Sequence, residues 1–230
     1  MKMINLGFTK LGLPIHAYHF LPAKMQPTDS ITNNLAKALV IGGVHGDEPE
    51  GVVASRGLLE QFRQNYSLQL DLILIPEMNP EGVLLKTRGN SNKVDLNRNL
   101  PTKDWSPVAA TERYHPGPSP ESEAENKILV RLINDYKPHV IFSLHSWKPM
   151  LNINGLLPEA DVISKITGYI IDPDIGYPTP GSLGTYAGHE KKIPTLTYEV
   201  ERDISFDQII KIHVPAIIEG LKVSQNRSSK

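Results

Sequence analysis

The stretch that decides the fold is "ALVIGGVHGDEPEG", Ala38–Gly51, in which an apolar run ends at paired glycines and a polar turn follows. The apolar run is typical of a buried strand, and the acidic residues around Pro49 are typical of a helix N-terminus. The turn between them carries an imidazole, His45, and two carboxylates, Asp47 and Glu48. Potential metal ligands therefore lie between a predicted strand and a predicted helix.

The alternation of strand and helix continues along the chain. Further apolar runs predict buried strands over residues 70–76, 139–145 and 195–200. Amphipathic patterns predict helices over residues 48–64, 119–136, 157–170 and 206–223, the last with a kink at Pro215. This order predicts a single-domain α/β fold, with a mixed, mostly parallel twisted β-sheet and helices on both faces. Residues 79–118 and 172–190 lack periodicity and are predicted to be long irregular segments, which in a compact domain are usually functional or disordered.

Length and charge narrow the class of protein. The 230 residues fit one domain, 1–230, with a short polar tail at about 224–230. A formal net charge of −1 favours neither nucleic acid nor an anionic membrane as a partner. The first residues do not have the pattern of a signal peptide, and no run approaches the ~18 apolar residues of a membrane span. We therefore expect a cytoplasmic protein that binds neither nucleic acid nor membrane.

Polar side chains follow the predicted strands where each strand ends. His45 and Glu48 follow the first strand, His145 ends the third and Glu199 ends the fourth. Because ligands of open α/β sheets bind outside the carboxyl ends of the strands, we expect these side chains to converge. The chain has no cysteine, so a metal would need His, Asp or Glu ligands, and two histidines with one carboxylate make an open zinc set. His45 and Glu48 are expected to share a face at the start of a helix, and Glu199 is the candidate general base.

Each of these signals is weak when it stands alone. A lone H-x-x-E pattern is common, and Glu199, taken alone, is better explained as an ordinary carboxylate at a strand end. We assign no chemistry to the other histidines, which are His16, His19, His115, His139, His189 and His213. The hypothesis therefore depends on the co-occurrence of the signals.

Several motifs occur together in the order of a known family. They are "GGVHGDEPEG", "NPEG", "VDLNRN", "GPSPESEAE", "SLHSW", "GYPTPGSLGTY" and "TYEVE". From Ala38 to about residue 201 the chain thereby resembles the zinc carboxypeptidases of the M14 type, above all the short bacterial branch that includes murein peptide amidase. The resemblance implies one zinc ion per chain, held by His45, Glu48 and His145, with Glu199 as the general base.

The resemblance also implies roles in substrate binding. Asn97 and Arg98 of "DLNRN" match the pair that binds the terminal carboxylate of the substrate, a group that a planar guanidinium binds in a bidentate manner. Tyr177 matches the mobile tyrosine that caps bound substrate, with Tyr186 of the same loop as the alternative. Arg88 matches an arginine that stabilises the oxyanion, with an exposed loop arginine as the alternative interpretation.

The resemblance implies a metallopeptidase or amidase that hydrolyses an amide bond next to a free carboxylate. In the short bacterial branch this is the γ-D-glutamyl–diaminopimelate bond of murein peptides, and a cytoplasmic enzyme would serve peptidoglycan recycling. The loop "PGSLG" offers small, uncharged residues, which leave room for a large polar side chain. Three alternatives remain open: an N-acyl amino acid deacylase of the succinylglutamate type, a carboxypeptidase that removes glutamates from protein tails, and a catalytically silent peptide-binding protein.

Overall fold

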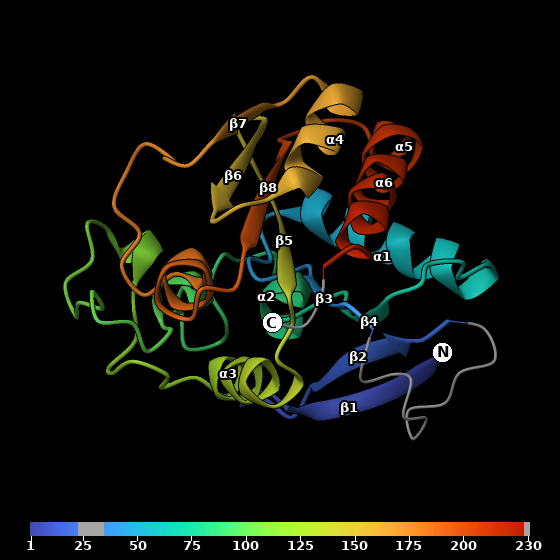
Figure 1. Ribbon diagram of the computed structural model, residues 1–230. Coiled ribbons are helices and arrows are strands. Elements are labelled where there is room, and N and C mark those ends of the chain that lie inside the picture. The colour runs from blue at the N-terminus through green and yellow to red at the C-terminus, as the bar shows by residue number, and fades with distance from the viewer. Residues whose placement is uncertain (23–34, 228–230) are drawn as a thin grey trace.

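The computed structural model describes residues 1–22 and 35–227 and contains an 8-stranded sheet of order β1-β2-β4-β3-β5-β8-β6-β7 (Figure 1). The strands are β1 (Lys2–Phe8), β2 (Pro14–Phe20), β3 (Lys37–Ile41), β4 (Asp71–Ile75), β5 (Val140–Trp147), β6 (Met150–Asn154), β7 (Ile170–Asp172) and β8 (Thr195–Glu201). The central pairs β4–β3, β3–β5 and β5–β8 are parallel, as is β6–β7, while β1–β2, β2–β4 and β6–β8 are antiparallel. The predicted mixed, mostly parallel sheet is confirmed.

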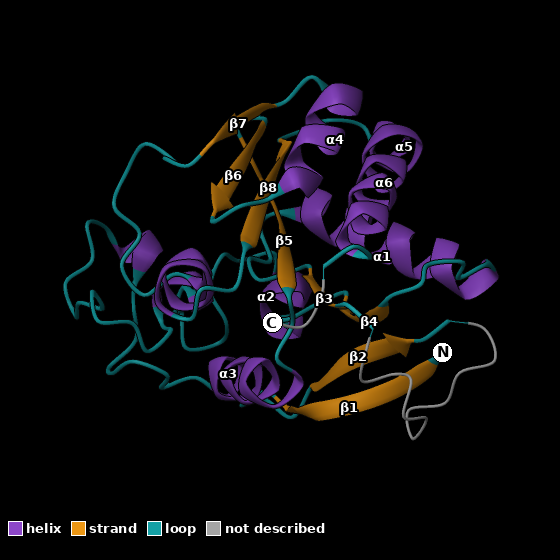
Figure 2. Ribbon diagram, viewed as in Figure 1, coloured by secondary structure: helices purple, strands orange, loops and turns teal. Residues whose placement is uncertain are grey.

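Helices cover both faces of this sheet (Figure 2). The α-helices are α1 (Pro49–Gln64), α2 (Pro80–Leu85), α3 (Ala124–Tyr136), α4 (Pro158–Thr167), α5 (Phe206–Gln208) and α6 (Val214–Ser224). Short 3₁₀ helices span Leu96–Arg98 and Glu112–Tyr114, and π-helical segments span Gly184–Glu190 and Ile209–His213. Helices α1, α4 and α6 pack together on one face, and α3 lies on the other.

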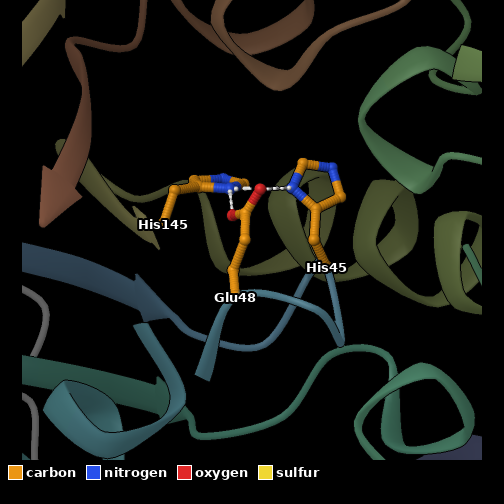
Figure 3. Close-up of side chains that lie close together, drawn as sticks. All are labelled: His45, Glu48 and His145. Carbon is orange, nitrogen blue, oxygen red and sulfur yellow. Dashed lines mark hydrogen bonds and ion pairs between the residues drawn. The ribbon is translucent and has the colours of Figure 1, made fainter. Parts of the chain in front are cut away.

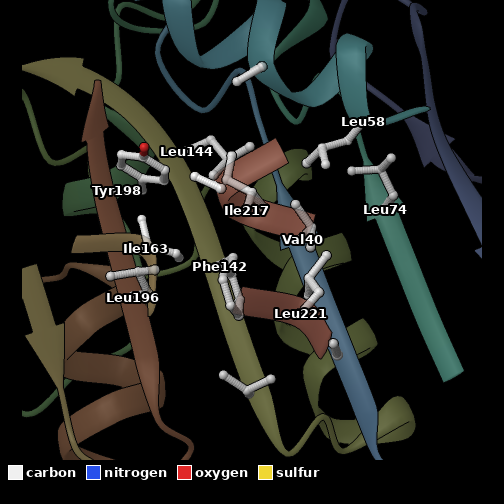
Figure 4. Close-up of a cluster of buried hydrophobic side chains, with 14 of the residues drawn as sticks. Val40, Leu58, Leu74, Phe142, Leu144, Ile163, Leu196, Tyr198, Ile217 and Leu221 are labelled. Atoms are coloured by element: carbon white, nitrogen blue, oxygen red, sulfur yellow. The ribbon is translucent and has the colours of Figure 1, made fainter. Parts of the chain in front are cut away.

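The central strands are buried on both faces, which explains their continuous apolar sequences. Val40, Leu74 and Phe142 point toward the layer of α1, α4 and α6 (Figure 4). Their neighbours Leu39 and Ile141 belong to a second apolar cluster, which includes residues of α3. Because side chains alternate across a strand, a run such as "ALVI" supplies both layers at once.

The chain contains strands that the apolar pattern did not predict. β1 and β2 form an N-terminal hairpin, which extends the sheet through the antiparallel β2–β4 pair. The helix predicted over residues 157–170 ends at Thr167, because Gly168 has a φ of 74° and terminates it. β7 then begins at Ile170.

The C-terminal helical segment differs from its prediction in two details. The backbone widens into the π-helical turn Ile209–His213 just before Pro215, and a separate helix, α6, begins at Val214. The predicted polar tail begins later than expected, because Ser224 is buried and its hydroxyl donates to Glu159. Arg227 also forms an ion pair with Glu159, while residues 228–230 lie outside the described residues.

The carboxyl ends of β3, β5 and β8 lie side by side at one edge of the sheet, since these strands are neighbours and parallel. In the β5–β8 register, His145 is directly opposite Glu199. The turn after β3 meets the same edge, and it is there that the polar side chains gather. Within residues 1–22 and 35–227, no helix has both the length and the apolar composition for a membrane crossing.

Candidate metal centre and active site

Three buried side chains from two distant parts of the chain converge at this edge (Figure 3). His45 and Glu48 come from the turn between β3 and α1, and His145 comes from β5. The Nδ1 atom of His45 lies 2.9 Å from Oε1 of Glu48, and Nδ1 of His145 lies 2.9 Å from Oε2 of the same carboxylate. One ligand atom from each of the three residues lies within 4.8 Å of the others, so the group can hold a single metal ion.

The turn, and not a helix face, brings His45 and Glu48 together. α1 begins at Pro49, so the expectation that both side chains project from the helix start is wrong in detail. The turn is packed closely against α2: a Cβ atom added at Gly46 would lie 1.9 Å from the carbonyl carbon of Gly82. Only glycine allows this approach, which sets the position of the turn.

The ring nitrogens that point away from the centre have partners of their own. Nε2 of His45 donates to Oδ1 of Asp95 at 2.9 Å, and Nε2 of His145 lies 2.9 Å from Oγ of Ser143. Burial acts to raise the pKa of Asp95, but His45 and Arg88 hold it below its usual range. Because an ionised carboxylate only accepts hydrogen bonds, His45 keeps its proton on Nε2 and presents Nδ1 to the centre.

The electrostatics of the centre favour a charged Glu48. Burial acts to raise the pKa of Glu48, but His45 and His145 hold it well below its usual value. Burial and the charge of Arg88 act to lower the pKa of His45, but Glu48 and Asp95 outweigh them and raise it. A cation would displace any proton on Nδ1, because metal ligands must be deprotonated. Two imidazole nitrogens and one carboxylate match the open ligand set of zinc, and the residues present therefore fit a zinc site.

Arg88 reaches the same centre instead of lying in solvent. Its Nη1 lies 3.0 Å from Oε1 of Glu48, its Nε donates to Oδ2 of Asp95 at 2.8 Å, and its side chain is 11% exposed. These two carboxylates raise the pKa of Arg88 despite its burial, so the guanidinium is a fixed positive charge beside the centre.

Glu199 lies across the β5–β8 ladder from His145 and is 6% exposed. Burial raises the pKa of Glu199 to about 7 against the opposing charge of His145, and the charge of Glu48 adds to the rise. Its Oε2 is buried and has no hydrogen-bond partner in the described part of the chain. A carboxylate in this environment is suited to exchange protons near neutral pH.

Asn97 and Arg98 come from the 3₁₀ turn that Asp95 caps by accepting from the backbone N–H of Asn97 at 2.9 Å. The side-chain oxygen of Asn97 accepts from the N–H of Leu183 at 2.8 Å, so the NH₂ group is the part of this side chain that can donate to a ligand. The guanidinium of Arg98 lies 5.9 Å from the centre of the Tyr177 ring. These groups form a second, donor-rich side of the site.

One pocket of about 490 Å³ connects these groups, and all the predicted site residues line it: His45, Glu48, Arg88, Asn97, Arg98, His145, Tyr177 and Glu199. Tyr186, the alternative to Tyr177, is 5% exposed and packs in the apolar cluster with residues of α3. The structure thus brings Tyr177 to the pocket and places Tyr186 in the core.

The sequence interpretation did not include several residues that the structure places here. Asp95 is the first residue of "DLNRN", and Ser143 precedes His145 by two positions on the same face of β5, so local signals existed for both. Tyr114 and Arg202 also line the pocket. No local pattern marks them, because long-range packing brings them to the site.

Comparison with known proteins places this geometry in a family. Residues 1–158, which carry all three ligand candidates, match the family described as zinc carboxypeptidase. The chain belongs to the zinc carboxypeptidase family. It is accordingly a hydrolase, and its group of His45, Glu48 and His145 fits the zinc site that the family name describes.

Relatives of this zinc carboxypeptidase include bacterial amidases. The chain is 29% identical over 229 residues to murein peptide amidase A of Vibrio campbellii, an alignment that covers 95% of this chain and 86% of the relative. It is 28% identical over 197 residues to murein peptide amidase A of Escherichia coli strain K12, covering 79% of this chain and 74% of the relative.

Solved structures show the same fold. The crystal structure of murein-tripeptide amidase from Escherichia coli O157 superposes with a TM-score of 0.77 at 24% identity, over 100% of this chain and 94% of that one. Carboxypeptidase A from Helicoverpa armigera gives a TM-score of 0.74 at 18% identity, over 97% of this chain and 67% of the other.

Proposed function

We propose that this zinc carboxypeptidase is a murein peptide amidase that hydrolyses the γ-D-glutamyl–diaminopimelate bond of murein peptides. The observation that carries the proposal is its similarity to murein peptide amidase A over 95% of the chain, joined to a complete set of candidate catalytic groups in one pocket. The bond lies next to a free carboxylate, which matches the donor-rich side of the site.

In this proposal His45, Glu48 and His145 hold one zinc ion per chain. Bound zinc supplies a Lewis acid for the amide carbonyl and lowers the pKa of water. The outer partners Asp95 and Ser143 orient the two imidazoles for this task.

Glu199 and Arg88 carry the proton transfer and the charge stabilisation. The buried carboxylate of Glu199 takes a proton from the attacking water and delivers it to the departing amine. The guanidinium of Arg88 donates to the oxygen on which negative charge develops, and its contact with Asp95 fixes its direction.

Asn97 and Arg98 bind the free carboxylate of the residue that leaves, and Tyr177 caps it. The ring of Tyr177 packs edge-on against Trp147 with centroids 5.6 Å apart, which places it at the wall of the pocket. Uncharged polar groups also line the pocket, among them Asn152, Asn154, Thr185 and Thr197. Such a polar lining suits a leaving residue with a large polar side chain, as diaminopimelate has.

A panel of substrates tests the proposal. Purified, zinc-loaded protein is incubated with L-Ala-γ-D-Glu-diaminopimelate, an α-linked C-terminal peptide, N-succinylglutamate and a glutamate-tailed peptide, with a chelator-treated sample as the control. We expect release of diaminopimelate at the highest kcat/KM, and loss of this activity in the treated sample. Faster hydrolysis of another member would contradict the assigned bond, and a zinc-loaded protein that cleaves none would be a silent binding protein.

The proposed place of this reaction is the cytoplasmic recycling of released wall peptides. A pocket of about 490 Å³ accommodates a short peptide end. We expect the free tripeptide to be hydrolysed and intact, cross-linked sacculi to release no diaminopimelate. Release from intact sacculi at a comparable rate would contradict a role confined to recycling.

A further inference from the structure

The guanidinium of Arg202 joins the two segments that carry the candidate metal ligands. Its Nη1 donates to the backbone carbonyl of Asp47 at 3.0 Å, and its Nη2 donates to the carbonyl of Ser146 at 2.9 Å. Asp47 directly precedes Glu48, and Ser146 directly follows His145. One side chain therefore spans the gap between the turn after β3 and the end of β5.

Arg202 is itself firmly placed at the end of β8. Its backbone N–H donates to the carbonyl of Trp147 at 3.1 Å, which continues the ladder between β5 and β8. The next N–H, of Asp203, donates at 2.9 Å to Glu50, a carboxylate that is 3% exposed. The other oxygen of Glu50 accepts from the hydroxyl of Ser146. These hydrogen bonds hold in place the backbone from which the side chain of Arg202 projects.

The two side-chain hydrogen bonds of Arg202 are with neutral carbonyls, and its ion pair with Glu48 is longer than either of them. Its nearest carboxylate oxygen, Oε1 of Glu48, lies 3.8 Å from Nη2, beyond hydrogen-bond distance. Arginine suits this arrangement because its planar group presents several donors in a rigid fork, whereas lysine offers one flexible ammonium.

We propose that Arg202 is a positioning residue, which sets the spacing between the turn carrying His45 and Glu48 and the strand end carrying His145. Through that spacing it sets the affinity of the site for zinc. The inference rests on the proposed zinc role of these three side chains. Ligand groups must be held within about 0.5 Å of their productive geometry, and the loss of an outer partner typically weakens metal binding about 10–100-fold.

The test measures zinc affinity directly by competition with a chromogenic chelator, at a temperature where circular dichroism shows each protein to be folded. The variants are Arg202→Lys, which keeps the charge, and Arg202→Gln, which removes it. The matched control is Arg113→Gln. Arg113 also contacts Asp47, but through the side-chain oxygen Oδ2, at 2.7 Å, and not through the backbone carbonyl.

We expect both Arg202 variants to bind zinc at least about tenfold more weakly than wild type, and the control to change less than about threefold. Wild-type affinity in Arg202→Lys, or an equal loss in the control, would show that the contacts of Arg202 with the two carbonyls do not set the zinc affinity, and would overturn the inference. If Arg202→Gln does not fold, the lysine variant decides. Absence of zinc binding in the wild type would instead overturn the proposed metal site, a different result from a change confined to the variants.

Discussion

At the scale of single residues, side chains around the candidate metal centre make hydrogen bonds with more than one neighbouring residue. Asp95 is fully buried and accepts from His45 with one oxygen and from Arg88 with the other. It therefore fixes the tautomer of a candidate ligand and the direction of a candidate oxyanion donor at once. The backbone around it is also tied down, since its Oδ1 accepts from the N–H of Asn97.

Replacement of Asp95 by asparagine tests this double role. An amide of the same shape is neutral, so it holds the proton on Nε2 of His45 more weakly and leaves Arg88 without one charged partner. We expect zinc affinity in Asp95→Asn to fall about 10–100-fold. Equilibrium dialysis with metal analysis measures it, and Asp135→Asn, at an exposed position of α3, is the control. Unchanged zinc content at limiting zinc would show that Asp95 does not orient a ligand.

Glu199 is the residue whose replacement separates catalysis from metal binding. Glu199→Gln keeps the shape of the side chain but cannot accept a proton, so we expect a folded protein with normal zinc content and a kcat lower by about 10²–10⁴-fold. Steady-state rates on the γ-D-glutamyl tripeptide and metal analysis provide the two readouts. Glu201→Gln, an exposed position two residues further along β8, should retain full activity. A Glu199→Gln enzyme with wild-type kcat would remove this carboxylate from the mechanism.

At the scale of secondary-structure elements, the site depends on how closely α1 approaches β5. A Cβ atom added at Gly51 would lie 2.5 Å from the carbonyl oxygen of Leu144, in a strand backbone that has no room to move. Glu48 immediately precedes α1 and His145 follows Leu144. The distance between the helix and the strand therefore sets the distance between two candidate ligands.

Gly51→Ala is expected to push α1 away from β5. The added methyl group overpacks a rigid contact, so we expect the free energy of unfolding to fall by about 1–3 kcal/mol. Urea unfolding of the metal-free protein measures the change. In the same helix, a Cβ at Gly57 would meet side-chain atoms and no backbone, namely Cδ1 of Ile210 at 2.6 Å, which is 40% exposed, and Cγ2 of Val214 at 2.8 Å, which is buried. Side chains adjust more easily than a strand backbone. Gly57→Ala should therefore cost less, and an equal loss in both variants would argue against a specific helix–strand contact.

The sequence predicts elements well where burial is complete. β3, β4 and β5 supply both apolar clusters and were predicted, because a doubly buried strand needs an almost uninterrupted apolar run. β8 was also predicted, although only one of its faces is apolar. β1 was not predicted, because it is an edge strand with four of its seven residues exposed and polar residues in its sequence. The π-helical segment Gly184–Glu190 was also missed, since its small and polar residues lack an apolar period.

The same reasoning separates the predictable part of the site from the rest. Residues within the family motifs, such as His45 and Arg98, were predicted from the sequence and line the pocket. Arg202 and Tyr114 were not predicted, because their contacts cross between segments far apart in the chain. A sequence motif contains residues that are close together in the chain, whereas a contact such as that of Arg202 with Asp47 joins segments that meet only after folding.

At the scale of the whole molecule, the sheet separates two layers of helices and keeps ionisable groups in both. On one side, His213 packs behind β8 with its Nδ1 2.6 Å from the hydroxyl of Tyr198. On the other, Glu125 near the start of α3 is 1% exposed. Burial raises the pKa of Glu125 to about 7 and lowers the pKa of His213 to about 4. As the pH rises, the loss of the proton from Glu125 lowers the free energy of unfolding, whereas the titration of His213 raises it. Each effect must therefore be measured with a variant of its own.

For His213 the sign follows from its depressed pKa. Between about pH 6.5 and pH 4 the unfolded chain binds a proton at this histidine while the folded chain does not, so acid favours unfolding. The contribution of neutral His213 is complete above pH 6.5, is lost as pH falls toward 4, and amounts to at most about 3 kcal/mol.

We expect the free energy of unfolding of His213→Gln to fall less than that of the wild type as the pH is lowered. Urea unfolding of the metal-free protein at pH 7.5, 6 and 4.5 measures it, as the difference between variant and wild type, so that the opposite trend from Glu125 cancels. His115→Gln, which alters an exposed histidine, should follow the wild-type curve, and a His213→Gln curve with the same pH slope would show that His213 titrates alike in both states.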